Sequence, residues 1–251
     1  MSPLQHRRIV PAWLGQALGL LFAVSMLQAD PAAFEKANKL YNDDQYAEAA
    51  EAYLQISKNG VSANLLFNLG NAYFKTDQLG RSMAAYHRAL QLAPRDSDIK
   101  MNLSFAQQKA LTKPIEPTLR QAWLRNLSQG EWTGLASFAG TILLILLTLR
   151  QVKKTGGPGT IWVQVTGAIT FIAVLLLIMA LIDRSGNKRA FAVQDGVVVR
   201  IGPVEQSPEI FQATDGMEFV VLGHNENFVN VRSSNGATGW VRDTDVAFTQ
   251  P

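Results

Sequence analysis

The stretch LLFNLGNAYFKTDQLGRSMAAYHRALQLAP, from Leu65 to Pro94, decides the fold of the N-terminal half of the chain. Both halves of the stretch are typical of helices, Asp77-Gln78 marks a turn between them, and Pro94 stops the second helix. Small side chains would let two antiparallel helices approach closely, while large ones fill the space beside them. The small residues are Gly70, Ser82 and Ala89, and the large ones are Leu66, Leu69, Tyr73 and Tyr86. The stretch therefore predicts packing rather than chemistry.

Counted from Ala63, these residues fall at places 4, 7, 8, 11, 20, 24, 27 and 32, a pattern that resembles the tetratricopeptide repeat. A fainter copy counted from Asp30 has matching residues at Ala37, Leu40, Tyr46, Ala49 and Tyr53. After Pro94, Asp96 or Ser97 would cap a third helix with an apolar stripe. We therefore expect residues 30–110 to form two all-α tetratricopeptide hairpins and a capping helix. Since two repeats are few for independent stability, the array should lean on a partner, a second copy or the membrane-proximal segment.

The resemblance also implies a concave peptide-binding face, formed by places 2, 5, 9 and 12 of each first helix. Aromatic and amide side chains at these places suit a peptide backbone and apolar anchors. The candidate protein-binding residues are Phe34, Asn38, Tyr41, Asn64, Phe67, Asn71 and Phe74. Two of the amides resemble part of a clamp for a terminal carboxylate, but Phe34, Met101 and Phe105 stand where such a clamp has cations. A helical bundle that binds nothing stays open as the alternative.

Three apolar runs divide the chain. The first follows a basic start and ends in small residues near Ala29, so residues 1–29 are interpreted as a signal peptide or an uncleaved anchor. The others, Trp132–Leu149 and Ile161–Ile182, carry no charge and as helices would measure about 27 and 33 Å. We predict transmembrane helices at 132–149 and 161–182, joined by a cytoplasmic hairpin loop at 150–160. The Lys and Arg counts beside the spans are nearly even, so the signal-like start decides the topology, which places 30–131 and 183–251 outside the cytoplasm.

The segment between the array and the first span, residues 111–131, begins with a linker whose prolines, Pro114 and Pro117, forbid a continuous helix. Apolar residues then fall near one face, at Leu119, Trp123, Leu124 and Leu127. This spacing favours a short helix at the membrane interface. A partly ordered linker is the alternative.

The last segment, residues 190–251, has β-branched runs separated by turn residues, which predicts a small all-β barrel. The runs VVVRIGP from Val197, MEFVVLG from Met217 and NGATGWV from Asn235 resemble a bacterial SH3 domain in order and spacing. The resemblance implies an aromatic-lined groove for peptides or cell-wall fragments. The candidate contacts are Phe211, Phe228 and Trp240, although Trp240 is favoured as a core residue.

Composition excludes several classes of function. The chain has no cysteine, so it has no disulfide, thiol catalysis or zinc–thiolate site. Its net charge of +3 comes from short segments beside the apolar runs, while residues 190–251 carry eight acidic and three basic side chains. The sequence has no basic stripe interleaved with aromatic residues, so we do not expect nucleic-acid binding. The histidines His6, His87 and His224 lie in separate segments, and no catalytic or metal-binding motif is present. We expect no enzyme activity, catalytic residue, metal or cofactor.

The order of segments, a signal, two tetratricopeptide units, two spans and an SH3-like tail, resembles the BatE family of the bacterial Bat aerotolerance system. These proteins are encoded with Bat proteins that carry von Willebrand A domains and with a MoxR-type ATPase. The resemblance implies a multi-domain membrane scaffold in the bacterial inner membrane, with its soluble domains on the periplasmic side and the von Willebrand A-domain Bat proteins as protein partners. A cell-wall sensor that binds peptidoglycan is the alternative. The sequence leaves open the bound peptide, signal cleavage, homo-oligomer formation and the trigger.

Overall fold

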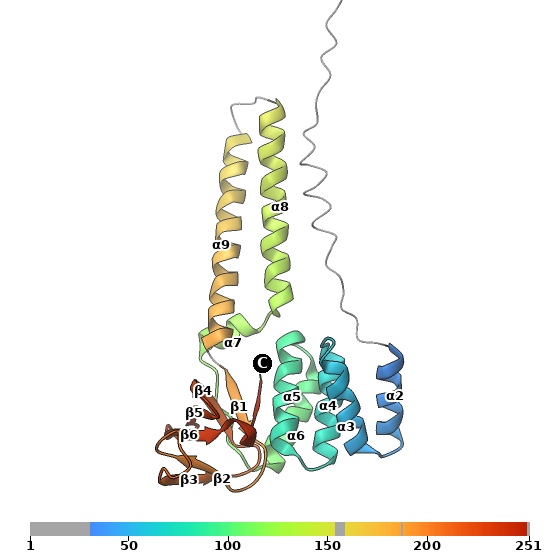
Figure 1. Cartoon of the computed structure of the whole chain (residues 1–251). Helices are drawn as coiled ribbons and strands as arrows, with labels where there is room; N and C mark the ends of the chain where they lie inside the picture. The colour runs from blue at the N-terminus through green and yellow to red at the C-terminus, as the bar shows by residue number, and fades with distance from the viewer. Residues whose placement is uncertain (1–30, 154–158, 187, 250–251) are drawn as a thin grey trace, which may run out of the picture.

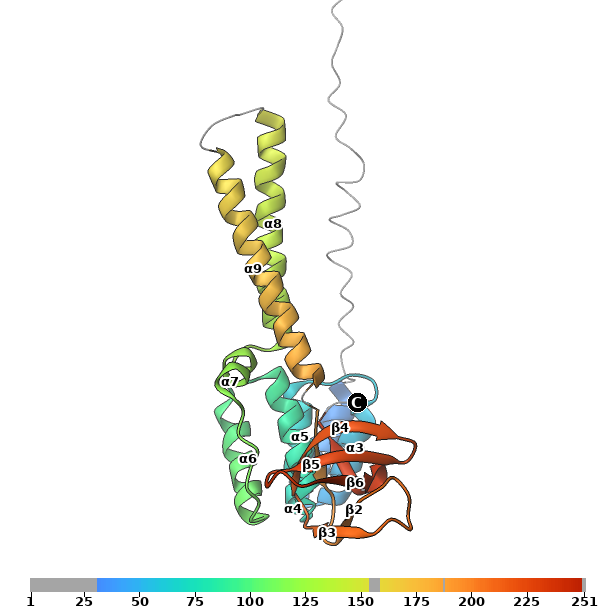
Figure 2. The ribbon, with the colours of Figure 1, turned by 90° about the vertical axis from the view of Figure 1, so that its left-hand side faces the viewer.

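The computed structural model describes residues 31–153, 159–186 and 188–249 (Figure 1). The predicted signal segment 1–29 and the centre of the predicted loop 150–160 lie outside the described residues. The described chain forms a helical array, a long helical hairpin and a β-domain. Figures 1 and 2 show the array and the β-domain at the same end of the hairpin, in contact with each other.

The array consists of two helical hairpins and a capping helix, as predicted. Ser62 caps α4 with a 3.1 Å hydrogen bond from the Leu65 amide, and Asp96 caps α6. Asp44 and Asp77 stand in the turns of the two hairpins, and both adopt positive φ angles, 58° and 62°. The helices are α2 (Pro31–Asn42), α3 (Tyr46–Ser57), α4 (Ala63–Lys75), α5 (Leu79–Leu92) and α6 (Ser97–Lys109).

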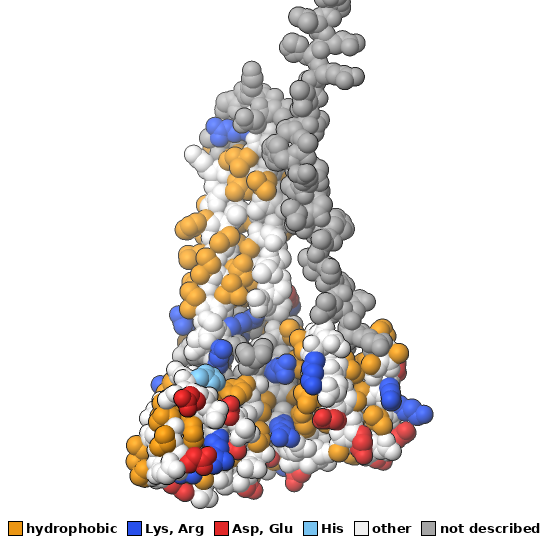
Figure 3. Space-filling view, viewed as in Figure 1, with side chains coloured by type: hydrophobic (Ala, Val, Ile, Leu, Met, Phe, Trp, Pro, Cys, Tyr) orange, Lys and Arg blue, Asp and Glu red, His pale blue; other side chains and the backbone are white. Residues whose placement is uncertain are grey.

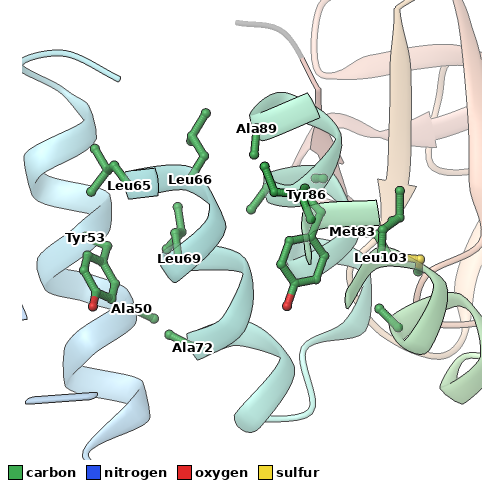
Figure 4. Packing of buried hydrophobic residues seen from close by; sticks show 14 of the residues in the cluster. Ala50, Tyr53, Leu65, Leu66, Leu69, Ala72, Met83, Tyr86, Ala89 and Leu103 are labelled. Atoms are coloured by element: carbon green, nitrogen blue, oxygen red, sulfur yellow. The ribbon is translucent and has the colours of Figure 1, made fainter. Parts of the chain in front are cut away.

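The small residues of the opening stretch explain how closely α4 and α5 pack. A Cβ atom at Gly70 would lie 2.5 Å from the ring of Tyr86, so only glycine fits there. The Ser82 hydroxyl donates to the Gly70 carbonyl at 2.8 Å and so needs no water inside the core. Figure 4 shows the leucines of α4, with Leu69 among them, between Tyr53 of α3 and Tyr86 of α5.

The helical hairpin is formed by α8 (Gln129–Lys153) and α9 (Gly159–Gly186), and the short helix α7 (Leu119–Arg125) precedes it. Within the described residues, Gln129–Arg150 and Ile161–Gly186 are long and apolar enough to cross a membrane. Both exceed the predicted 132–149 and 161–182. The first begins earlier because Ser128 and Glu131 form reciprocal backbone–side-chain hydrogen bonds of 2.7 and 3.2 Å.

The β-domain is a seven-stranded antiparallel sheet with the strand order β3-β2-β6-β5-β4-β1-β7. Val199, Phe219, Val231 and Val241 belong to its core. The predicted hairpin turn at Gly236 joins β5 to β6, and its φ of 87° suits glycine. The strands are β1 (Arg189–Ala192), β2 (Val197–Arg200), β3 (Glu209–Ala213), β4 (Glu218–Asn225), β5 (Phe228–Ser233), β6 (Thr238–Arg242) and β7 (Val246–Phe248), with a 3-10 turn at Asp243–Asp245.

The β-domain covers one side of the array, a support for the two repeats that was not among those predicted. Phe191 of β1 is 1% exposed and belongs to the array's own core, where its ring stacks on His87 at a centroid distance of 5.2 Å. The Asp215 carboxylate accepts hydrogen bonds from the amides of Leu79 and Gly80, at 2.8 and 2.9 Å, and thereby caps α5. The domain that follows the spans thus completes the helices that precede them.

Two glycines permit this close approach. A Cβ atom at Gly80 would lie 1.8 Å from the Ala192 carbonyl oxygen, and one at Gly216 would lie 2.3 Å from the Met83 side chain. Gly216 also has a φ of 82°, and its amide donates to the same Ala192 carbonyl at 2.9 Å. A side chain at either glycine would force the two modules apart.

Candidate protein-binding site

The concave face of the array is formed by the first helix of each unit, α2 and α4, together with the capping helix α6. Met101 and Phe105 of α6 are each 50% exposed and extend the face beyond the predicted residues. Of the predicted residues, Asn64 is exposed, and the others are half-buried: Phe34, Asn38, Tyr41, Phe67, Asn71 and Phe74. The structure therefore places all seven on α2 and α4, with α6 as a third wall.

Asn38 and Asn71 of this face have a structural role that the sequence pattern did not reveal. The Asn38 Oδ1 atom accepts hydrogen bonds from the Tyr53 hydroxyl at 2.7 Å and from Asn68 at 3.1 Å. Asn71 repeats the arrangement one unit later, accepting from the Tyr86 hydroxyl at 2.7 Å and from Asn102 at 2.8 Å. Each asparagine thus ties its own hairpin to the next helix of the array.

Burial explains why the two tyrosines act as donors. It raises the pKa of both Tyr53 and Tyr86 to about 12, so each phenol keeps its proton at neutral pH. With their Oδ1 atoms engaged, Asn38 and Asn71 are less available to a ligand than the aromatic side chains. The aromatic side chains are therefore the better probes of binding at this face.

The charges beside the concave face are partly neutralised. Lys109 of α6 lies 5.1 Å from the centre of the Phe74 ring and forms a 2.8 Å ion pair with Asp77. Lys75 lies 5.5 Å from the Tyr46 ring. These two cations therefore lie over aromatic rings, and the face presents aromatic side chains beside asparagines that are already hydrogen-bonded, which suits an extended peptide with apolar side chains better than a terminal carboxylate.

The predicted contacts of the β-domain differ in accessibility. Phe228 is 8% exposed and offers little surface, whereas Phe211 and Trp240 are half-buried. Near Trp240, the apolar side chains of Ile201, Val204 and Ile210 are 64%, 52% and 43% exposed. Figure 3 shows hydrophobic side chains gathered over the lower left of the molecule, where Figure 1 places β3. This surface faces away from the array.

Ion pairs hold the base of the helical hairpin. Arg189 pairs with Glu218, which is 3% exposed, and both bind the linker through Ile115: Glu218 accepts from its amide at 2.7 Å, and Arg189 donates to its carbonyl at 2.9 Å. At the end of α9, Arg125 donates to the buried Asp183 at 3.0 Å. The chain before the hairpin is thus fastened to the chain after it.

The described residues hold no group of three or more His, Asp or Glu side chains that could bind a metal ion. His87 and His224 lie in different modules, and each is near an aromatic ring, Phe191 and Phe248 respectively.

Comparisons with known families agree with this geometry. Residues 63–96 match the tetratricopeptide repeat, which corresponds to α4, α5 and the turn after them. Residues 195–247 match the bacterial SH3 domain, which begins after β1 and ends within β7. No curated protein matches the chain. The chain thus contains a tetratricopeptide repeat and a bacterial SH3 domain, which suggest protein–protein interaction or cell-wall binding, and its described residues include two helices long and apolar enough to cross a membrane.

Proposed function

We propose that this chain is a non-enzymatic, membrane-anchored scaffold that recruits a protein partner through the concave face of its tetratricopeptide array. The observation that carries the proposal is the contrast within the array: α5 on its convex side is covered by the β-domain, while Phe105 and Met101 on the concave side stay half-exposed. Side chains of this kind cost free energy in water unless a partner covers them. An extended segment with apolar side chains fits such a face.

The resemblance to the BatE family gives this scaffold a setting. We place it in the bacterial inner membrane with both soluble modules on the periplasmic face, in a Bat and MoxR-type system for envelope stress or aerotolerance. Its partners there would be von Willebrand A-domain Bat proteins. Two features support a shared side: both modules lie at the same end of the hairpin, and they share one core cluster that contains Phe191.

A second candidate function is a peptidoglycan sensor or anchor. The exposed apolar surface at Ile201, Val204 and Ile210, next to Trp240, favours it because sugar rings and short peptides bind apolar and aromatic surfaces. In this reading the β-domain holds the wall and the hairpin reports to the cytoplasm.

Two variants of the full chain separate the candidates, and each serves as the control for the other. Phe105→Ser changes the concave face, and Ile201→Ser changes the β-domain surface. The scaffold predicts that Phe105→Ser lowers crosslinked recovery of a von Willebrand A-domain partner from native membranes about tenfold, while Ile201→Ser leaves recovery unchanged. Loss of co-sedimentation with purified cell wall in Ile201→Ser alone would favour the sensor. Equal partner recovery in both variants would contradict the assignment of the concave face as the binding site.

The absence of cysteine allows a direct test of topology. Single cysteines at the exposed positions Lys58, Arg150 and Ser234 can be labelled in spheroplasts with a membrane-impermeant maleimide. We expect labelling at Lys58→Cys and Ser234→Cys, and labelling at Arg150→Cys only after the membrane is opened. Labelling of Arg150→Cys in intact spheroplasts would overturn the proposed orientation.

A further inference from the structure

A cavity of about 530 Å³ lies where the array, the linker, α7, the end of α9 and the start of β1 meet. This volume is in the range of small-molecule sites. Its walls include His87 of α5, Lys100 of α6, Ile115 of the linker, Arg125 of α7 and Arg189 of β1. The described concave-face residues and the described β-domain surface lie elsewhere, so the cavity is a separate site.

The lining of the cavity is positively charged. Its basic side chains are Lys100, Arg125, Arg184 and Arg189, and its one acidic side chain is Glu116. Arg125 and Arg189 are held in place by the buried carboxylates of Asp183 and Glu218, which do not line the cavity. Lys100 is exposed and has no ion-pair partner among the described residues. Such a wall favours an anion.

His87 gives a second and independent sign of a ligand. Its ring lines the cavity, yet its buried Nε2 atom has no hydrogen-bond partner among the described residues. Burial, together with the charges of Arg189 and Arg125, lowers the pKa of His87 to about 3, so the imidazole is neutral in a positive field. An anion beside the arginines would offset that field at the imidazole.

The place of the cavity indicates where the anion comes from. One wall is α7, whose Leu119 and Trp123 side chains are 92% and 55% exposed and would suit the boundary of a bilayer. Another wall is the end of α9, the second candidate span. Figure 3 shows Lys and Arg side chains where the helical hairpin meets the soluble modules. A phospholipid headgroup beside the spans would therefore lie at the mouth of the cavity.

We propose that this cavity binds the phosphate group of an anionic phospholipid, with Lys100, Arg125 and Arg189 as its basic contacts. The inference rests on the proposed insertion of α8 and α9 in a membrane. Bound there, the lipid touches the array, the linker and the β-domain together. A soluble phosphate ester shares the chemistry of the headgroup, so the test separates the two sources.

The test uses the full chain in nanodiscs of phosphatidylcholine, with and without phosphatidylglycerol. The chain has three histidines, so selective isotope labelling of histidine allows the His87 signal to be assigned by substitution. We expect phosphatidylglycerol to shift the His87 signal and to raise its pKa. Free glycerol 3-phosphate, added to nanodiscs of phosphatidylcholine alone, should leave the signal unchanged. A shift with free glycerol 3-phosphate but not with phosphatidylglycerol would overturn the lipid assignment. So would the lack of a shift with either ligand.

Variants provide the binding controls. Lys100→Gln should weaken phosphatidylglycerol retention, measured by native mass spectrometry, about fivefold. Ala122→Trp, which fills the cavity from α7, should abolish retention, and Lys58→Gln, at an exposed lysine just after α3, should not change it. Equal retention in Lys100→Gln and Lys58→Gln would contradict the proposal. A chain that fails to enter nanodiscs would count against the membrane anchor itself, whereas an inserted chain with an unresponsive His87 would refute only this inference.

Discussion

The two sides of the helical array differ in burial. The convex side, at α5, is covered by the β-domain, and Phe191 of β1 is almost fully buried against it. The concave side, on α2, α4 and α6, is open and carries Phe105 at 50% exposure. The same repeated hairpin therefore buries one side in the fold and leaves the other open, the side that we propose binds a partner. Substitutions on the two sides should then separate stability from binding.

The largest effect is expected at Gly80 on the covered side. In Gly80→Ala the added Cβ would lie 1.8 Å from the Ala192 carbonyl oxygen, so the modules must separate or the backbone must shift. We expect a loss of about 3 kcal/mol in the free energy of unfolding, measured by urea denaturation of the full chain in detergent micelles. Gly223→Ala is the matched control because its Cβ would meet no atom within 4 Å. Equal stability of the two variants would mean that the modules do not pack as described.

The next effect concerns acid. The pKa of His87 in the folded chain, about 3, lies below its ordinary value of 6.5, so the unfolded chain takes up the proton first as the pH falls. The stabilisation is complete above pH 6.5 and is lost as the pH falls toward 3. Between pH 6.5 and 5 the loss should be roughly 2 kcal/mol. His87→Gln should lack this pH-dependent loss. Subtracting its profile of unfolding free energy against pH from that of the unsubstituted chain removes the contribution of the carboxylates, which both proteins share. Parallel profiles would contradict the burial of this imidazole.

A smaller effect is expected at Asp215, the cap that the β-domain supplies to α5. Asp215→Ala removes the acceptor of the Leu79 and Gly80 amides and should cost about 1–2 kcal/mol. Hydrogen exchange should show faster exchange of these two amides than of the Leu65 amide, which Ser62 caps within the array. Asp43→Ala, an exposed acid in the first turn of the array, is the control. Unchanged exchange at Leu79 would show that the cap is dispensable.

The smallest effect on stability is expected on the open side. Phe105→Ser removes a half-exposed ring and should change the free energy of unfolding by no more than about 0.5 kcal/mol, even though we expect it to weaken partner binding. A clear loss of stability in Phe105→Ser would contradict the conclusion that the open side contributes little to folding.

Asn71→Ala, on the same face, should lower the free energy of unfolding, because it removes the acceptor of the Tyr86 and Asn102 hydrogen bonds. We expect it to destabilise the array by about 1–3 kcal/mol.

Local patterns were enough to predict the parts of the fold. The spacing of Gly70, Ser82 and Tyr86 predicted the helical hairpin, and Asn235-Gly236 predicted the β-hairpin, because each depends on neighbours in sequence. The capping residue Asp96 was likewise among those expected. The helices α8 and α9 were expected from uninterrupted apolar runs, and only their ends differed.

The assembly of the parts could not be predicted in this way. The contact of Asp215 with the Leu79 and Gly80 amides joins residues more than a hundred positions apart. Nothing in the type of these residues indicates a distant partner. Gly80 was the available signal, since glycine in the first turns of a helix is unfavourable unless something approaches closely. The role of Asn71 was hidden for a similar reason: its pattern fits a ligand contact and a structural bond equally well. The burial of Phe228 depends on the path of the whole sheet.

The fastening of Ile115 to Arg189 and Glu218 has a mechanical consequence. Because the linker before α7 and the chain that leaves α9 are joined at the base of the hairpin, we expect α8 and α9 to move together rather than independently. A pull on the array or on the β-domain moves both helices as one lever. Under the proposed insertion of α8 and α9 in a membrane, a signal carried across it by this chain would be a motion of the hairpin as a whole.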